Sequence, residues 1–140
     1  MTPFLSALTA ALCWGFAPFL EKAGLRGVPD PVIGVFVRSV GVTLGTLVAF
    51  PFFVKTYGSL SGLPTRNLIY LGLGGILASL VGQTFFYRAL KYGELSRSVA
   101  IGASYPVVAC VLGLIFWKEP LTLSKACGVV LVTLGITLLR

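Results

Sequence analysis

Long apolar runs and short polar segments alternate along the whole chain. Each run is close to the roughly 20 residues that an α-helix needs to cross the hydrocarbon core of a bilayer. Because lipid offers no hydrogen bonds to the backbone, an apolar run of this length satisfies its N–H and C=O groups by forming a helix. The pattern predicts five membrane-spanning helices, at residues 3–20, 32–53, 67–87, 98–117 and 121–139.

The connection between the last two runs is the shortest. Only Lys118, Glu119 and Pro120 lie between them, so we expect these two helices to form a tight hairpin. Pro120 is expected in the first turn of the last helix, where an N–H would have no intrahelical partner. Glu119 would stand just before that turn, where a carboxylate favours the positive end of the helix dipole.

The composition agrees with a membrane protein. Hydrophobic residues make up 56% of the 140 residues and charged residues only 11%, whereas a soluble domain carries about 25% charged residues. The net charge of +7 comes from basic residues that flank the apolar runs one or two at a time, as anchors at a membrane boundary do. We therefore expect an all-α integral membrane protein, one domain over residues 1–140, whose partner is the lipid bilayer and not nucleic acid.

The residue types needed for enzyme chemistry are scarce. The chain has no histidine and one aspartate, which falls in a predicted loop, so Ser/His/Asp catalysis is excluded. The three cysteines lie within apolar runs and lack CxxC spacing, which argues against a metal site. We expect no enzyme activity, no metal and no cofactor.

Arg38 lies about two turns inside the second apolar run. An arginine at the centre of a membrane helix costs about 2.5–3.5 kcal/mol on insertion scales, so it is usually kept for a reason. Three interpretations are open: the side chain reaches the nearer interface, it holds an anionic group, or it pairs with Glu21. We place Glu21 and Lys22 in the polar loop that follows the first run.

Other polar side chains lie at membrane depth. Gln83 and Tyr87 are one turn apart on the third predicted helix and face the same way. Ser104 and Tyr105 lie beside Pro106, which is expected to kink the fourth helix because it lacks an N–H. Each of these four residues either bonds a neighbouring helix or lines a polar cavity.

Trp14 lies too near the middle of the first run to be an interfacial anchor, which leaves core packing or stacking on a substrate. The candidate substrate-binding residues are thus Trp14, Arg38, Gln83, Tyr87, Ser104 and Tyr105.

Small residues form rows in two of the runs. Gly74, Ala78 and Gly82 recur every four residues in the third run, and Gly128 and Gly135 are seven apart in the last. Small residues let helix backbones approach closely in lipid. The rows either pack helices within the chain or form an interface between subunits.

Several of these features together resemble a known family, one EamA-type module of the drug/metabolite transporter superfamily. The resemblance covers essentially the whole chain, and the C-terminal third is its most specific part. The matching features are Trp14-Gly15, Arg38, Tyr87-Arg88-Ala89-Leu90, Ser104-Tyr105-Pro106-Val107, Glu119-Pro120-Leu121, and the stretch from Gly128-Val129-Val130-Leu131 to Gly135-Ile136.

Members of this superfamily are commonly ten-helix proteins built from two such modules in inverted orientation. This chain resembles the small five-helix bacterial and archaeal branch, so the resemblance implies one half of an inverted-repeat transporter. Transporters of this kind hold the substrate between two halves and rock one half against the other. A second copy would supply the missing half, which implies a homodimer.

An antiparallel homodimer requires that copies insert into the membrane in both orientations. The basic residues divide weakly between the two faces, which leaves dual topology, a parallel dimer and a sister subunit open under the positive-inside rule. The face of the amino terminus carries four of them, Lys55, Arg66, Lys118 and Lys125, and the other face carries six, Lys22, Arg26, Arg88, Lys91, Arg97 and Arg140.

The expected function is transport of a small metabolite or related solute across the cytoplasmic (inner) membrane by a multi-pass protein. Trp14 and Tyr105 would stack on or orient the substrate, and Arg38 would hold an anionic group or a structural partner. A multidrug cation exporter is less expected, because the nearest carboxylate to a membrane-deep position is Glu21, at the end of its run. The alternative is a non-transporting membrane subunit, or a lipid-linked carrier, that acts with a partner protein.

Overall fold

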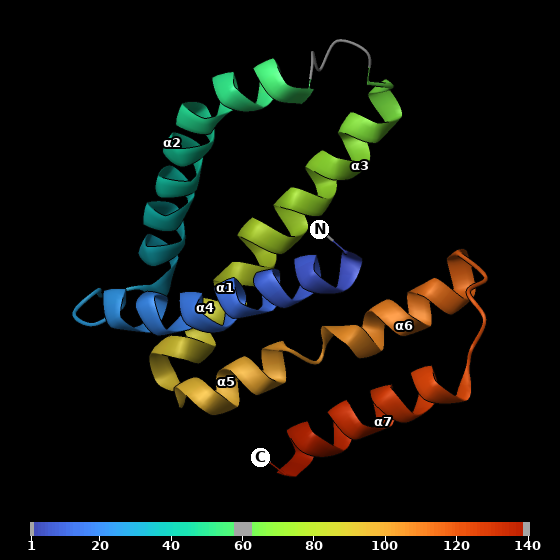
Figure 1. Cartoon of the computed structure of the whole chain (residues 1–140). Helices are drawn as coiled ribbons and strands as arrows, with labels where there is room; N and C mark the ends of the chain where they lie inside the picture. Colours follow the sequence, from blue (N-terminus) through green and yellow to red (C-terminus); the bar gives the residue numbers. More distant parts are fainter. Residues whose placement is uncertain (1, 58–62, 139–140) are drawn as a thin grey trace. The chain divides into compact units, whose positions relative to one another are not determined.

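The computed structural model describes residues 2–57 and 63–138, and these residues form helices and turns without a β-strand (Figure 1). The elements are α1 (Pro3–Gly24), α2 (Pro31–Tyr57), α3 (Thr65–Ile76), the π-helical segment η2 (Leu77–Gly82), α4 (Gln83–Tyr92), α5 (Leu95–Gly102), α6 (Tyr105–Phe116) and α7 (Leu123–Leu138).

Among the described residues, four helical stretches are long and apolar enough to cross a membrane, namely Pro3–Gly24, Pro31–Lys55, Thr65–Tyr92 and Leu95–Phe116. The fifth apolar helix, α7, has 16 residues, which is about 24 Å at 1.5 Å per residue. The predicted last span ends at residue 139, and positions 139 and 140 lie outside the described residues. The all-α, multi-pass membrane architecture is confirmed.

The first helix continues further than its apolar run. Glu21 and Lys22, which the sequence places in a loop, lie in the last turn of α1, so that expectation is wrong. A helix ends where the backbone must turn and not where polarity begins, and here the turn contains Gly27 at φ +78°. A lysine in the last turn also favours the negative end of the helix dipole.

The chain divides into two compact units, which are residues 20–91 and residues 1–19 with 92–140. We call them the α2–α4 unit and the α5–α7 unit. The α2–α4 unit has a small apolar core in which four side chains are at most 4% exposed: Leu25, Val35, Tyr87 and Leu90. This core joins the residues just after α1 to the first turns of α2 and to α4.

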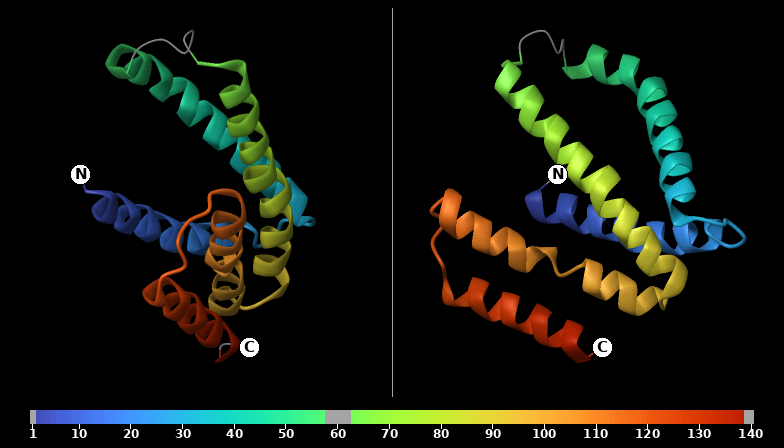
Figure 2. Two further views of the ribbon diagram at one scale, coloured as in Figure 1. Left: turned by 90° about the vertical axis from the view of Figure 1, so that its right-hand side faces the viewer. Right: turned by 180° about the vertical axis from the view of Figure 1, so that it is seen from behind.

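Within the α2–α4 unit, α3, η2 and α4 follow one another as one continuous helical rod (Figure 2). The π-helical backbone of residues 77–82 was not predicted from the sequence. A π-helical turn adds a residue to the α-helical repeat, so the side chains after Gly82 face a different direction than an uninterrupted α-helix would give them. The row through Gly74, Ala78 and Gly82 therefore does not keep one face.

The predicted fourth span is broken into two helices in the α5–α7 unit. Residues 103 and 104 form a turn between α5 and α6, and Pro106 lies in the first turn of α6. Because Pro106 has no N–H for the carbonyl four residues earlier, a continuous helix would lose a bond at this point. The distortion predicted beside Pro106 is confirmed, and it takes the form of a break between two helices.

The connection between α6 and α7 forms a hairpin, as predicted, and the two helices lie side by side (Figures 1 and 2). The N–H groups of Trp117 and Glu119 both donate to the carbonyl of Gly113 at 3.1 Å. Lys118 between them has φ 50°, a left-handed conformation that commonly ends helices.

Pro120 is not in the first turn of the last helix, since α7 begins at Leu123. Thr122 caps α7 instead. Its Oγ1 accepts a hydrogen bond from the backbone N–H of Lys125 at 3.2 Å, and its carbonyl accepts one from Ala126 at 3.0 Å. A threonine hydroxyl is a good N-cap because it satisfies an N–H that has no partner within the helix.

Candidate functional site

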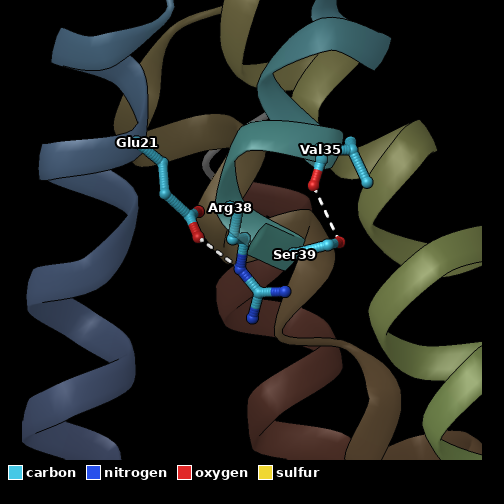
Figure 3. Close-up of polar contacts among 4 residues, drawn as sticks. All are labelled: Glu21, Val35, Arg38 and Ser39. Atoms are coloured by element: carbon cyan, nitrogen blue, oxygen red, sulfur yellow. Dashed lines mark hydrogen bonds and ion pairs between the residues drawn. The ribbon is translucent and has the colours of Figure 1, made fainter. Parts of the chain in front are cut away.

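The centre of the candidate site is an ion pair between α1 and α2. Nε of Arg38 donates to Oε1 of Glu21 at 3.2 Å, and Figure 3 shows the two side chains pointing toward each other. Of the interpretations that the sequence left open for Arg38, pairing with Glu21 is what the structure shows. A carboxylate in the last turn of a helix is unfavourable for the helix dipole, and the guanidinium compensates for it.

The guanidinium uses only one edge for this pair. Both Nη atoms of Arg38 point away from Glu21 in Figure 3. The nearby hydroxyl of Ser39 donates to the carbonyl of Val35 at 2.8 Å in its own helix, so it does not compete for Glu21. Arginine carries five N–H donors in a planar fork that matches carboxylate or phosphate.

Two residues of α4 complete the group. With its amide oxygen turned toward Arg38, Gln83 accepts from Nε at 3.2 Å and from Nη2 at 3.3 Å. Tyr87 is buried, with 3% of its surface exposed, and its hydroxyl interacts with Glu21 and Arg38. The one-turn spacing of Gln83 and Tyr87 predicted that they face the same way, and both face the ion pair: Gln83 meets Arg38 and Tyr87 meets Glu21.

Gly34 allows α4 to approach α2 closely. A Cβ at this position would lie 2.6 Å from Cδ2 of Leu25 and 3.1 Å from the ring of Tyr87. An added side chain would therefore crowd Leu25 and the buried ring of Tyr87, which would have to shift. The sequence analysis missed Gly34, although its place one turn before Arg38 puts the two residues on one face of α2.

The ion pair is partly shielded from the surroundings. The side chain of Glu21 is 14% exposed and that of Arg38 is 31% exposed. An arginine at membrane depth is costly unless it is paired or faces a wet cavity. The guanidinium of Arg38 is therefore the less covered member of the pair.

The other three candidate residues lie in the α5–α7 unit. Trp14 and Tyr105 are exposed, and Ser104 is half-buried in the turn between α5 and α6. Trp14 lies on α1 about two turns before Glu21. The structure brings Arg38, Gln83 and Tyr87 together, while a shared site with Trp14, Ser104 and Tyr105 stays a prediction.

Metal coordination has no ready ligand set in the part of the chain that the structure describes. No group of three or more His, Cys, Asp or Glu residues there is placed to hold an ion. The chemistry that this group of residues supports is hydrogen bonding and charge recognition.

Comparison with known proteins identifies the family. The sequence profile of the EamA-like transporter family matches residues 1–140. The chain belongs to the EamA-like transporter family. The resemblance inferred from the Trp14-Gly15, Glu119-Pro120-Leu121 and related features is thereby confirmed.

Relatives of this EamA-like chain come in two lengths. A protein of Sinorhizobium sp named an uncharacterized transporter in cobO 3′region is 30% identical over 135 residues, which cover 96% of this chain and 91% of the relative. An uncharacterized protein of Methanocaldococcus jannaschii is 27% identical over 139 residues, which cover 99% of this chain and 96% of the relative.

Longer relatives contain a matching region as part of a larger chain. An uncharacterized transporter of Archaeoglobus fulgidus is 23% identical over 137 residues, which cover 97% of this chain and 47% of the relative. The EamA-like chain thus spans about half the length of that protein. No solved structure shows a significant match to the chain.

Proposed function

We propose that this EamA-like protein transports a small metabolite with an anionic group across the cytoplasmic membrane. The observation that carries the proposal is the guanidinium of Arg38, which lies about two turns inside α2 and is only partly covered. It contacts Glu21 through Nε alone. Family membership makes transport the expected activity. The positive charge of Arg38 is the reason for proposing an anionic solute.

The proposed binding step is an exchange of partners at Arg38. A solute carboxylate or phosphate takes the Nη edge of the fork, where a two-point contact is possible. Gln83 and Tyr87, which already touch the pair, then offer hydrogen bonds to the solute. The contact between Arg38 and Glu21 weakens in this step, so the ion pair opens when the anion binds.

We further propose that Trp14, Ser104 and Tyr105 line the same pathway. Their aromatic and hydroxyl groups suit stacking on a solute and orienting its polar atoms. Tyr105 is the best of the three to test, because its side chain is exposed and it stands at the first residue of α6.

Alternating access is proposed to need two copies of the chain, arranged as a homodimer. The A. fulgidus relative is about twice as long as the region that matches this chain, which fits two modules acting together. Gly128 and Gly135 also have no atom within 4 Å of an added Cβ, so the small-residue row of α7 leaves room for another backbone. Cytoplasm-active and periplasm-active reporters fused separately to the C-terminus distinguish the arrangements: activity from both supports an antiparallel pair, and activity from one excludes it.

Uptake into proteoliposomes tests the proposed activity. The probes are radiolabelled monocarboxylates, dicarboxylates, amino acids and sugar phosphates, supplied one class at a time. We expect uptake of an anionic class, with an apparent KM raised about tenfold or more by Arg38→Lys, which keeps the charge but loses the two-point fork. Tyr105→Ala is expected to lower uptake as well.

The control is Arg88→Gln, a change of an exposed arginine on α4 that is not one of the proposed binding residues. Equal uptake by the wild-type, Arg38→Lys and Tyr105→Ala proteins would remove these site assignments. If no probe class is taken up while the protein co-purifies with another membrane protein, the role as a non-transporting subunit replaces the proposal.

A further inference from the structure

Glu21 differs from the other acidic residues of the chain in its burial. The chain has four acidic residues. Asp30, Glu94 and Glu119 are exposed, whereas the side chain of Glu21 is only 14% exposed. A carboxylate that is shielded from water keeps its charge at low cost only where a cation or hydrogen-bond donors compensate for it. The charge of Glu21 therefore depends on the groups that face it.

The groups that face Glu21 come from two other helices. From α2, Nε of Arg38 donates to Oε1 of Glu21 at 3.2 Å (Figure 3). From α4, the hydroxyl of Tyr87 hydrogen-bonds to the carboxylate, and the neutral amide of Gln83 bonds Arg38. On α1 itself, the ammonium group of the adjacent Lys22 donates to a backbone carbonyl of α4 at 2.7 Å. Arg38 is thus the cation that directly bonds the Glu21 carboxylate.

The pair of Arg38 and Glu21 has no net charge, and an anion bound to Arg38 would change this balance. The anion adds one negative charge, and Glu21 loses the donor that compensated its own. Where water is partly excluded, such an uncompensated charge is unfavourable. The hydroxyl of Tyr87 can bond either form of Glu21, because a hydroxyl both donates and accepts. A neutral Glu21 therefore suits the group of residues best once the anion is bound.

We propose that Glu21 is a proton-binding site and that the protein moves its anion together with one proton. The proposal rests on the anion transport proposed above. In this step the Glu21 carboxylate leaves Nε of Arg38, takes a proton from water and becomes a neutral carboxylic acid. The N–H bonds of Arg38 stay intact, and no electron is transferred. When the anion leaves, Glu21 returns the proton to water and bonds Arg38 again.

Binding of the proton and binding of the anion are then linked, and each favours the other to the same extent. A rise in pH removes the proton, restores the charge of Glu21 and returns Arg38 to the ion pair. In the pH range where Glu21 is charged in the free protein, the affinity for the anion therefore falls about tenfold for each pH unit, because one proton is taken up with each anion.

Proteoliposomes loaded with a pH-sensitive dye test the proposal, with the membrane potential clamped by potassium and an ionophore. The probes are the labelled monocarboxylates, dicarboxylates, amino acids and sugar phosphates described above, each supplied alone. Signals from protein-free vesicles are subtracted. We expect the lumen to acidify by about one proton for each anion taken up, and the apparent KM to rise about tenfold per pH unit. An inward proton gradient is expected to drive accumulation of the anion.

Glu21→Gln removes the proton site and keeps the shape of the side chain. Because glutamine is neutral, as the protonated Glu21 would be, this variant is expected to take up the anion without a proton and with a KM that is independent of pH. Glu119→Gln is the matched control, since Glu119 also pairs with a basic residue, Lys125, but is exposed at the hairpin. This control is expected to keep both the proton movement and the pH dependence.

The count of protons is made on the wild-type protein and so does not depend on the folding of either variant. Uptake of an anion without proton movement would overturn the proton site and leave the proposed anion transport standing. Proton movement that persists in Glu21→Gln, or is lost equally in Glu119→Gln, would overturn the assignment to Glu21. Absence of uptake for every probe would remove the anion transport and this inference together.

Discussion

Two ion pairs among the residues that the structure describes differ in their surroundings more than in their geometry. Arg38 and Glu21, in the α2–α4 unit, are 3.2 Å apart with side chains 31% and 14% exposed. Lys125 and Glu119, at the hairpin of the α5–α7 unit, are 2.9 Å apart but 44% and 56% exposed. The shorter pair is the more exposed one, so distance alone does not rank the two. We expect shielding from water to decide which pair contributes more to stability, because screening by water weakens an exposed charge interaction.

The two pairs also differ in what else holds their elements together. The hairpin has the two hydrogen bonds to the carbonyl of Gly113 and the Thr122 cap besides its ion pair. Around Arg38 the ion pair directly joins the last turn of α1 to α2, beside the small apolar core, and Gln83 and Tyr87 are gathered on it. Loss of one partner is therefore expected to matter much more in the α2–α4 unit.

The largest effect is expected when Glu21 is replaced by Gln. This change leaves Arg38 without its carboxylate, and breaking a fully buried pair costs about 3–5 kcal/mol. Because both side chains are partly exposed, we expect a loss of about 1–3 kcal/mol in the free energy of unfolding. Reversible unfolding in mixed micelles measures it.

A double-mutant cycle with Arg38→Gln then isolates the pair. The double variant is expected to be more stable than the sum of the single losses predicts, since no unpaired charge is left. Additive losses would mean that Glu21 and Arg38 do not interact energetically, and the contrast between the two units would disappear.

Gly34→Ala tests the packing that positions Tyr87 beside the ion pair. The new Cβ would lie 2.6 Å from Cδ2 of Leu25, and such overpacking costs about 1–3 kcal/mol. We expect a loss of about 1–2 kcal/mol in unfolding free energy. The control is Gly41→Ala on the same helix, where an added Cβ meets nothing within 4 Å.

Gly41→Ala is expected to leave stability unchanged or to raise it by up to about 1 kcal/mol, because alanine favours a helix. Similar losses in the two variants would show that α2 requires glycines for a reason other than contact with Leu25 and Tyr87.

The smallest effect is expected for Lys125→Gln at the hairpin. An exposed pair contributes about 0–1 kcal/mol, so we expect a change below about 0.5 kcal/mol under the same unfolding conditions. A loss as large as that of Glu21→Gln would show that exposure does not separate the two pairs.

The sequence predicted the helices well because apolar runs are a local signal. Lipid forces an apolar segment of sufficient length to bond its own backbone, whatever its neighbours are. The hairpin at Lys118–Pro120 and the disruption near Pro106 followed from the same local rules. The positions of Gln83 and Tyr87 on one helix face likewise needed only the helical repeat.

The residue with which Arg38 pairs was decided by the tertiary structure. The sequence left three interpretations for Arg38 and placed Glu21 in a loop, whereas the fold continues α1 through Glu21 and sets it against the guanidinium. The close approach at Gly34 depends on how α2 and α4 meet. Such contacts join residues far apart in the chain, and no local pattern records which of several suitable partners will meet.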